Sequence, residues 1–177
     1  MYYEIKTARL ILRPLNIKDL DTVHAYASDK ENTEFMLWLP NDTKEETAEF
    51  LTIVTKEWEK EHPSFYEFAI EFNSKQIGAV SICLNDEKTE GEIGWILNKQ
   101  YWGKGIATEA ALAIKDFAIN ELKILRLVAT CDYRNQSSCR VMEKTGLFLE
   151  DDNGIRTYPK RGETAKELTY ALNIPQR

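Results

Sequence analysis

A short glycine-containing loop lies between a predicted strand and a predicted helix. The loop, residues 100–105, contains Gly103 and Gly105; it follows a strand over 92–98 and precedes a helix over 106–120. Backbone N–H groups at a helix N-terminus have no partners within the helix and carry a partial positive charge. Glycines let such a backbone approach an anion closely. This segment therefore indicates a phosphate-binding loop.

Two common phosphate loops do not match this spacing. The dinucleotide-binding motif requires a third glycine where this chain has Thr108. The nucleoside-triphosphate loop requires Ser or Thr directly after its Gly-Lys pair, but Gly103-Lys104 is followed by Gly105. The alternative to a phosphate site is a tight strand-to-helix turn without a ligand.

The cysteines do not indicate a metal site or a disulfide framework. Cys83, Cys131 and Cys139 are widely spaced, and no Cys-x-x-Cys pair occurs. We therefore expect reduced thiols and no bound metal. Cys131 and Cys139 are expected to be packing residues rather than nucleophiles, because no His partner is visible in the sequence.

Length and charge limit the class of protein. The chain has 177 residues, 43% of them hydrophobic and 29% charged, which is typical of a globular domain and argues against disorder. We expect a single domain over 1–177. The formal net charge of -6 disfavours nucleic-acid binding and suits a cationic partner such as an amine, although solubility alone also explains it. No apolar stretch is long enough for a membrane span, so we expect a cytoplasmic protein without a membrane partner.

The periodicity of apolar residues predicts alternating strands and helices. In the first half we expect a strand over 9–13, a helix from Asn16 to about Ser28, and a second helix that begins at the Thr43/Glu46 capping box and carries Phe50, Ile53, Val54 and Trp58. Three strands should follow as an antiparallel meander, over 65–72, 76–84 and 92–98. In the second half we expect the helix 106–120, a strand over 125–131, a helix over 136–144, and strands over 147–150 and 166–172.

Longer blocks of the sequence resemble the GNAT superfamily of N-acetyltransferases. The loop Gln100-x-x-Gly103-x-Gly105 is similar to the superfamily's acyl-CoA pyrophosphate loop. Four blocks resemble the Rim-type subgroup, which includes the ribosomal-protein N-terminal acetyltransferases: TARLILRPL (7–15), EIGW (92–95), GKGIATEA (103–110) and NQSSCRVMEKTGL (135–147). The resemblance covers nearly the whole chain. Gln100 stands where the superfamily often has Arg, and Leu147 where Phe is usual.

The resemblance implies a fold and an activity. The fold is mixed α/β, with a central, mostly antiparallel, twisted sheet of about seven strands, a splayed parallel pair and about four flanking helices. The activity is transfer of the acetyl group of acetyl-CoA to a primary amine, by direct attack in a ternary complex. Subgroup members are often dimers, so a homodimer is compatible with the resemblance.

The resemblance also assigns candidate cofactor-binding residues. Backbone groups of Ile96 and Leu97 would pair with the pantetheine arm, and the loop headed by Gln100 would hold the pyrophosphate through its amides. Those amides belong to Gly103, Lys104, Gly105, Ile106 and Ala107, and Thr108 would add its hydroxyl. For Lys104 a solvated side chain is at least as good an interpretation. Asn135 would contact the pantetheine, although it is also a natural helix N-cap.

Two residues are candidates for catalysis. The subgroup has Ser where Ser138 stands, and we hypothesise that Ser138 contacts the sulfur and protonates the departing thiolate. Glu92 lies on the strand that would face the cofactor and is a candidate general base; a surface carboxylate is the alternative. Weaker candidates for the base are Glu67, Glu71 and His62. Ordered water could also carry the proton away from an α-amine, whose pKa is about 8.

The acceptor amine is left open by the sequence. The subgroup resemblance favours a protein N-terminal α-amine. The first alternative is a small amine such as a polyamine, an amino acid or an aminocyclitol antibiotic, and a second is an acyl-CoA-binding module without turnover. We expect Lys30–Glu61 and a loop over Asp151–Glu163 to form the walls of the amine site. An open groove between them would favour a peptide, and a closed pocket a small molecule.

Overall fold

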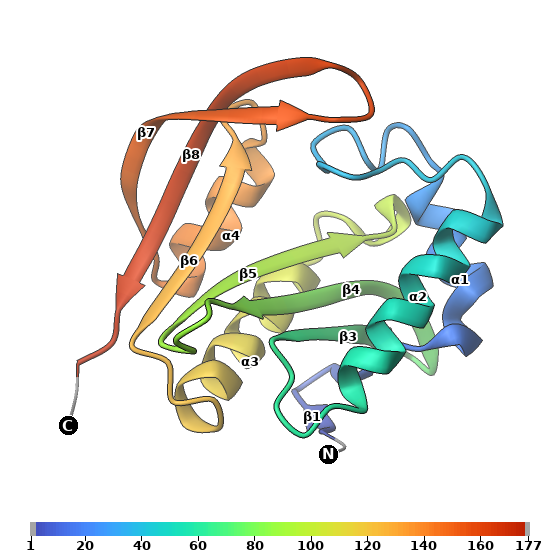
Figure 1. The fold of residues 1–177 in the computed structure, drawn as a ribbon, viewed down its shortest axis with the longest axis horizontal. Coiled ribbons are helices and arrows are strands. Elements are labelled where there is room, and N and C mark those ends of the chain that lie inside the picture. The colour runs from blue at the N-terminus through green and yellow to red at the C-terminus, as the bar shows by residue number, and fades with distance from the viewer. Residues whose placement is uncertain (1–2, 176–177) are drawn as a thin grey trace.

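The computed structural model describes residues 3–175, which form one sheet flanked by helices (Figure 1). The elements in chain order are β1 (Ile5–Lys6), β2 (Leu10–Pro14), η1 (Ile17–Asp19), α1 (Leu20–Ala27), α2 (Lys44–Trp58), β3 (Phe65–Phe72), β4 (Lys75–Leu84), β5 (Glu90–Leu97), η2 (Lys99–Tyr101), α3 (Ile106–Asn120), β6 (Arg126–Asp132), α4 (Gln136–Thr145), β7 (Phe148–Tyr158) and β8 (Glu163–Asn173).

The sheet has eight strands among the described residues, in the order β1-β2-β3-β4-β5-β6-β8-β7. All neighbouring strands are antiparallel except β5 and β6, which form the expected parallel pair. The sequence prediction of about seven strands omitted β1, because this strand has only two residues and no apolar alternation of its own.

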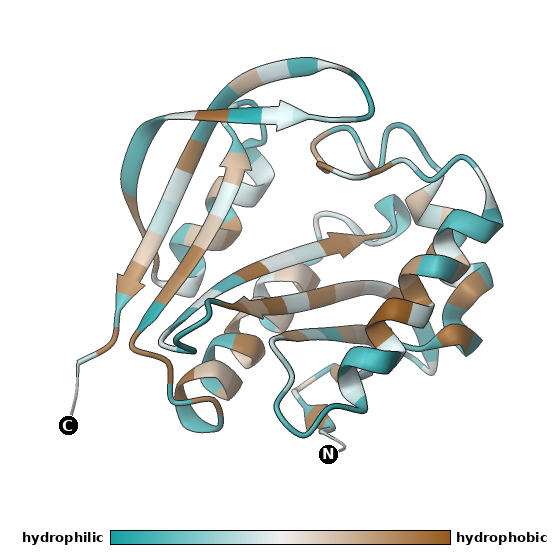
Figure 2. Cartoon of the chain, in the orientation of Figure 1, coloured by the Kyte–Doolittle hydropathy of each residue, from teal (hydrophilic) through white to brown (hydrophobic). Residues whose placement is uncertain are grey.

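The helices cover both faces of the sheet. In Figure 1, α1 and α2 lie in front of the sheet, whereas α3 and α4 lie behind it. The hydrophobic residues concentrate in β3, β4, β5 and the inward sides of the helices (Figure 2). Phe117 of α3 packs edge-on against Tyr66 and Phe68 at 5.6 and 5.4 Å between ring centroids. Tyr66 and Phe68 therefore face α3, and alternation turns Glu67 between them toward the opposite face.

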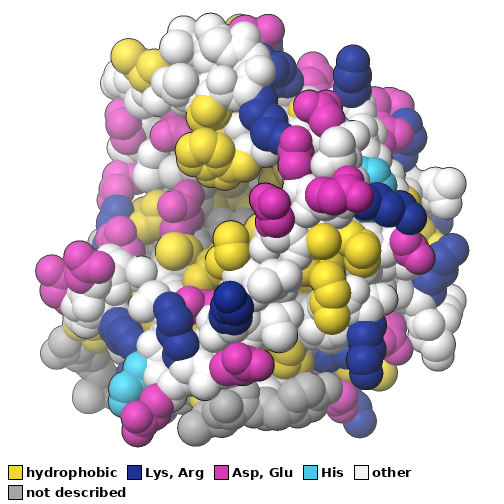
Figure 3. Space-filling view, turned by 45° about the vertical axis from the view of Figure 1, so that its right-hand side comes forward, with side chains coloured by type: hydrophobic (Ala, Val, Ile, Leu, Met, Phe, Trp, Pro, Cys, Tyr) yellow, Lys and Arg dark blue, Asp and Glu magenta, His cyan; other side chains and the backbone are white. Residues whose placement is uncertain are grey.

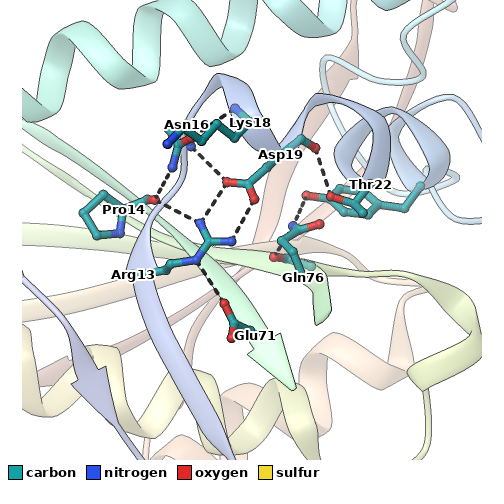
Figure 4. A network of polar contacts seen from close by, with 10 residues as sticks. Arg13, Pro14, Asn16, Lys18, Asp19, Thr22, Glu71 and Gln76 are labelled. Atoms are coloured by element: carbon teal, nitrogen blue, oxygen red, sulfur yellow. Dashed lines mark hydrogen bonds and ion pairs between the residues drawn. The ribbon is translucent and has the colours of Figure 1, made fainter. Parts of the chain in front are cut away.

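A polar network fixes the junction between β2 and α1 (Figure 4). Arg13 donates to both carboxylate oxygens of Asp19, at 2.8 and 2.9 Å, and to Glu71 of β3 at 3.1 Å. Asn16 caps the following turn through a capping box with Asp19. The predicted helix from Asn16 to Ser28 therefore begins as the short 3-10 helix η1, and α1 starts at Leu20.

The helix α2 begins at its predicted cap, where the Thr43 hydroxyl accepts a hydrogen bond from the Glu46 amide. Its buried side is made by Thr47, Leu51, Val54 and Trp58. Phe50 and Ile53, two of the apolar residues that this helix carries, are 37% and 63% exposed. The apolar residues of this helix are spread over more than one face, so their identity alone did not select the buried one.

The segment Asp151–Glu163 is not a loop, contrary to the prediction. β7 continues to Tyr158, and only the turn 159–162 separates it from β8. Register shifts between Leu149 and Asp151 and between Asp151 and Gly154 accommodate this polar stretch within the strand. Such bulges tolerate Asp, Asn and Gly, which read as turn signals in the sequence.

None of the helices in residues 3–175 is long and apolar enough to cross a membrane. The same residues contain no group of three or more His, Cys, Asp or Glu side chains arranged to hold a metal ion.

Candidate active site

The strands β5 and β6 are paired over a short stretch and then diverge. Their register joins residues 90–92 to residues 126–128 and stops there. Beyond this point β5 and β6 run apart, as Figure 1 shows. The antiparallel neighbours of both strands continue past the same level. The sheet therefore contains a V-shaped gap whose sides are the later residues of β5 and β6.

Ion pairs hold the closed end of the gap. Arg126, at the start of β6, donates to Glu90 of β5 at 2.8 Å and pairs with Glu150 of β7. It also donates to the Asn173 side chain at 3.2 Å. These contacts tie β6 to β5, β7 and β8 at the point where the parallel pair begins.

The glycine loop presents free amides beside the open end of β5. Gly103 and Gly105 have φ values of +73° and +72°, in the left-handed region that favours glycine. A Cβ added at Gly103 would meet nothing within 4 Å. Within residues 3–175, the amides of 103–108 make no recorded hydrogen bond to protein, and Gly105 is the helix N-cap without a side-chain cap. The arrangement fits the pyrophosphate of a CoA ester.

A side-chain clamp holds this loop, and the sequence hypothesis did not include it. Glu109, in the first turn of α3, accepts hydrogen bonds from the Thr7 hydroxyl and from Nε of Arg9, both at 2.6 Å. Nη1 of Arg9 donates to the Lys104 carbonyl at 3.0 Å. Burial opposes ionisation of Glu109, but the hydrogen bonds from Thr7 and Arg9 outweigh it and lower the pKa of this carboxyl.

The Lys104 side chain does not point into the cradle. Nζ of Lys104 donates to the Gln100 carbonyl at 3.1 Å and lies 5.1 Å from the centroid of the Tyr101 ring. The backbone N–H of Gln100 donates to the Asn98 side chain at 3.1 Å, and Gln100 is exposed. Both contacts order the loop from within. Within the loop, the cradle is therefore formed by backbone rather than by the Lys104 side chain.

Backbone alternation decides which residues of β5 face the gap. The Asn98 amide donates to the Ile77 carbonyl of β4, and the register is unbroken from there to residue 91. In an antiparallel pair, hydrogen-bonded residues alternate. Ile96 therefore directs its backbone groups toward β4, whereas Trp95 and Leu97 direct theirs toward the gap. The Leu97 carbonyl already accepts from the side chains of Asn32 and Trp102, at 2.9 and 3.0 Å.

The start of α4 lies on the other side of the gap. Asn135 caps this helix, its side-chain oxygen accepting from the Ser138 amide at 3.1 Å. Ser138 is half-buried in the first turn. The predicted capping role of Asn135 is therefore present. Its contact with pantetheine and the acid role of Ser138 stay predictions.

The two buried cysteines face each other behind β6. The sulfur atoms of Cys131 and Cys139 lie 3.6 Å apart. Burial raises the pKa of Cys131 to about 12, with the neighbouring Cys139 adding to the effect. Cys131 is therefore a neutral thiol near pH 7, which suits packing rather than nucleophilic attack.

The face of the sheet opposite α3 and α4 carries polar groups around the gap. Glu92 is the last residue of β5 that pairs with β6. Its exposed carboxylate accepts a hydrogen bond from the Thr130 hydroxyl of β6 at 2.9 Å. Asp132 lies at the end of β6 and accepts from Arg134 and Tyr158. Burial opposes ionisation of Asp132, but these hydrogen bonds lower its pKa to about 2. Figure 3 shows a hollow in the molecule with acidic and hydrophobic side chains at its rim.

The two predicted walls of the amine site contact each other. Nη2 of Arg156 in β7 donates to the Phe35 carbonyl at 3.3 Å. Nζ of Lys160, in the turn after β7, donates to the Pro40 carbonyl at 2.9 Å and pairs with Glu46 of α2 at 2.6 Å. Arg156 is itself anchored by Glu167 at 2.8 Å. We call these contacts, made by Arg156 and Lys160, the wall latch.

Comparison with known proteins gives consistent matches over most of the chain. Residues 9–147 match the family described as "Acetyltransferase (GNAT) domain". The relative YnaD of Bacillus subtilis (strain 168), named an uncharacterized N-acetyltransferase, is 31% identical over 95% of both chains. Spermidine N(1)-acetyltransferase of Escherichia coli (strain K12) is 26% identical over 80% of this chain and 74% of that protein.

Solved structures agree with these matches. A GNAT-family acetyltransferase from Bacillus anthracis superimposes with a TM-score of 0.83 at 31% identity, covering 97% of this chain and 98% of the other. RimL, a ribosomal alpha-N-protein acetyltransferase in complex with coenzyme A, has the same fold: its TM-score is 0.83 at 20% identity, over 97% and 98% of the two chains.

The chain belongs to the GNAT acetyltransferase family. It is an N-acetyltransferase of the kind that generally moves an acetyl group from acetyl-CoA to an amine. The fold predicted from the sequence, with its parallel pair and four α-helices within residues 3–175, is confirmed.

Proposed function

We propose that this enzyme acetylates a small cationic amine, held on the α1/α2 face of the sheet beside the gap between β5 and β6. The observation that carries the proposal is the wall latch. Lys160 and Arg156 join the β7–β8 hairpin to residues 35–40 and to α2. A latched wall suits a compact substrate better than an extended peptide.

The backbone geometry supports the cofactor side of the proposal. Acetyl-CoA supplies an activated acyl group as a thioester. The free amides of 103–108 would hold its pyrophosphate, and the backbone groups of Trp95 and Leu97 that face the gap would pair with the pantetheine arm. The family resemblance assigns this contact to Ile96 and Leu97. Because the backbone groups of Ile96 point toward β4, we assign it to Trp95 and Leu97 instead. An N–H of this pair would also polarise the thioester carbonyl.

Ser138 and Glu92 have distinct proposed roles. Ser138 would donate a proton to the departing thiolate, because it lies in the first turn of α4, next to the capped N-terminus. The exposed carboxylate of Glu92, oriented by Thr130, would attract the cationic amine toward the gap. Its role as a proton acceptor stays a prediction that Glu92→Gln tests.

A protein N-terminal α-amine is the second candidate acceptor. It is favoured by the blocks 7–15 and 135–147, which resemble the ribosomal-protein subgroup. A peptide would have to insert its terminus beneath the wall latch. The two candidates therefore differ in what loosening the latch should do.

The test is thioester cleavage over a panel of spermidine, n-butylamine, amino acids, aminocyclitols and short peptides with free α-amines. We expect small amines to react at least about tenfold faster, in kcat/KM, than the peptides. Lys160→Met, which breaks the ion pair with Glu46, should raise the KM for the small amine by about threefold. The control is Lys166→Met, which breaks an ion pair elsewhere on the hairpin and should leave this KM unchanged. Preference for peptides would favour the second candidate. Binding of CoA without transfer to any amine would contradict both.

A further inference from the structure

A buried carboxyl group lies on the amine face, one strand away from β5. Glu67 of β3 is directly opposite Ser81 of β4, and Ser81 is directly opposite Gly94 of β5. Residues opposite one another in antiparallel strands project from the same face, and neighbouring strands are about 4.8 Å apart. The three residues therefore form a row of about 10 Å that ends beside the gap.

Glu67 has no cationic partner. Its side chain is 8% exposed, and Ser81, the residue opposite it in β4, is the one group among the described residues that lowers its pKa. From α1 it is faced by the phenol of Tyr26; from α2, the indole N–H of Trp58 donates to the backbone carbonyl of Glu67 at 3.1 Å. Among residues 3–175, Glu67 takes part in no recorded ion pair. A buried carboxyl without a cation is costly to a fold, which makes it a candidate for function.

Gly94 leaves space at the end of the row. A Cβ added at Gly94 would lie 3.3 Å from Oγ of Ser81, so the hydroxyl is directed toward the empty position above Gly94. Gly94 is followed by Trp95, whose backbone faces the gap in which the thioester would lie. An amine nitrogen above Gly94 would reach both the Ser81 hydroxyl and the thioester.

We propose that Ser81 and Glu67 together take the proton from the substrate ammonium group, with its nitrogen above Gly94. The inference rests on the proposed function. The ammonium N–H bond breaks as Ser81 Oγ receives that proton, and the hydroxyl passes its own proton to the Glu67 carboxylate. The neutral nitrogen then bonds to the acetyl carbon as the C–S bond breaks. Its second proton goes to the thiolate through Ser138, and the Glu67 proton returns to solvent.

The electrostatics of the site suit this role. Burial raises the pKa of Glu67 to about 8, and the hydrogen bond from Ser81 limits the rise. A base is most effective when its pKa lies near the working pH, and an alkyl ammonium with a pKa of about 10.4 needs such a base. Exposed Glu92, in contrast, is oriented by Thr130 at the vertex of the gap, where it suits attraction of the amine.

The test compares Glu67→Gln, Ser81→Ala and Ser81→Thr with Glu87→Gln, a matched carboxyl-to-amide change in the exposed β4–β5 turn. The readouts are kcat/KM for spermidine from pH 6 to 9.5 and the Kd of CoA by calorimetry.

For the wild-type enzyme we expect an inflection near pH 8 in the plot of kcat/KM against pH. Glu67→Gln should abolish it and lower kcat/KM by about 100-fold, with the Kd of CoA within threefold. Ser81→Ala should lower kcat/KM by about tenfold, and Ser81→Thr, which keeps a hydroxyl, should recover most of it.

Gly94→Ala provides a second variant that leaves both proton-transfer groups in place. Its added methyl should fill the position above residue 94 and raise the KM for the amine at least fivefold, with the Kd of CoA unchanged. A Glu67→Gln enzyme that keeps the wild-type rate and inflection would overturn the inference while leaving the proposed function intact. A wild-type protein that binds CoA but acetylates no amine would instead remove the proposed function, and this inference with it.

Discussion

The proposed cofactor side and the proposed amine side of this enzyme are built in different ways. The proposed cofactor side would use backbone amides of one continuous segment, residues 103–108, and the Lys104 side chain folds back onto this loop. The proposed amine side would use side chains from β3, β4, β5, β6 and the β7–β8 hairpin. A net charge of -6 is compatible with an anionic cofactor for this reason, because the cradle needs no basic surface.

The difference teaches where specificity resides. Backbone recognition of a pyrophosphate does not depend on side-chain identity except at the glycines, so many relatives can share it. The amine site depends on which side chains stand at separate positions of the sheet. Substitutions on the two sides should therefore separate the KM for acetyl-CoA from the KM for the amine.

The largest expected effect comes from Ser138, which lies between the two sides. Ser138→Ala should lower kcat by about 100-fold, because the thiolate loses its proton donor. The Kd of acetyl-CoA should change less than threefold, since the capping bond at this position uses the Ser138 amide rather than its hydroxyl. Ser137→Ala, one residue earlier, is the control. Unchanged turnover in Ser138→Ala would remove the acid role.

The amine side should also be visible in stability against pH. An unfolded Glu has a pKa of about 4.5, whereas burial raises that of Glu67 to about 8. Because the folded state holds the proton longer, this group makes the free energy of unfolding fall as pH rises from about 4.5 to about 8. Between pH 5 and pH 7.5 the fall should be about 2–3 kcal/mol.

Glu67→Gln should not show this fall, because an amide does not titrate. Urea unfolding at several pH values would measure it, with Glu87→Gln as the variant that keeps the wild-type slope. Parallel curves for wild type and Glu67→Gln would mean that the Glu67 carboxyl ionises as an exposed one does.

The sequence predicted the cofactor side in more detail than the amine side, for a physical reason. Helix α3 begins and ends where expected, at Ile106 and Asn120, because its cap, its glycines and its apolar periodicity are local. The wall latch depends on Arg156 meeting Phe35, residues 121 positions apart, and on bulges that keep the polar stretch 151–154 within a strand. Neither leaves a periodic signal. Backbone alternation in β5 likewise depends on its pairing with β4.

The glycine loop should respond strongly to a side chain at Gly105. This residue has φ +72°, and a β-branched side chain there is strained. Gly105→Val should raise the Kd of acetyl-CoA by about tenfold or more, with no direct effect on amine binding. Gly162→Ala, at φ +66° in the β7–β8 turn, is the control for backbone strain outside the cofactor loop. Equal Kd values for the two variants would argue against a backbone cradle.

The clamp on this loop should have a smaller effect. Arg9→Met removes the side-chain hydrogen bonds to Glu109 and to the Lys104 carbonyl, but keeps the bond from the Arg9 backbone N–H to Glu109, so the loop loses part of its order. We expect the KM for acetyl-CoA to rise by about fivefold, with kcat within twofold. Glu109→Gln should act in the same direction, and the double variant should be less than additive because both changes break one contact. Additive effects would show that Arg9 and Glu109 act independently.

Steady-state kinetics with both substrates varied, in Lys104→Met and Glu92→Gln, test the division between the two sides most directly. Lys104→Met should leave the KM for acetyl-CoA within about twofold, because the cradle is backbone. Glu92→Gln should raise the KM for the amine by about fivefold and leave that for acetyl-CoA unchanged. A rise of tenfold or more in the KM for acetyl-CoA in Lys104→Met, together with an unchanged amine KM in Glu92→Gln, would contradict the division.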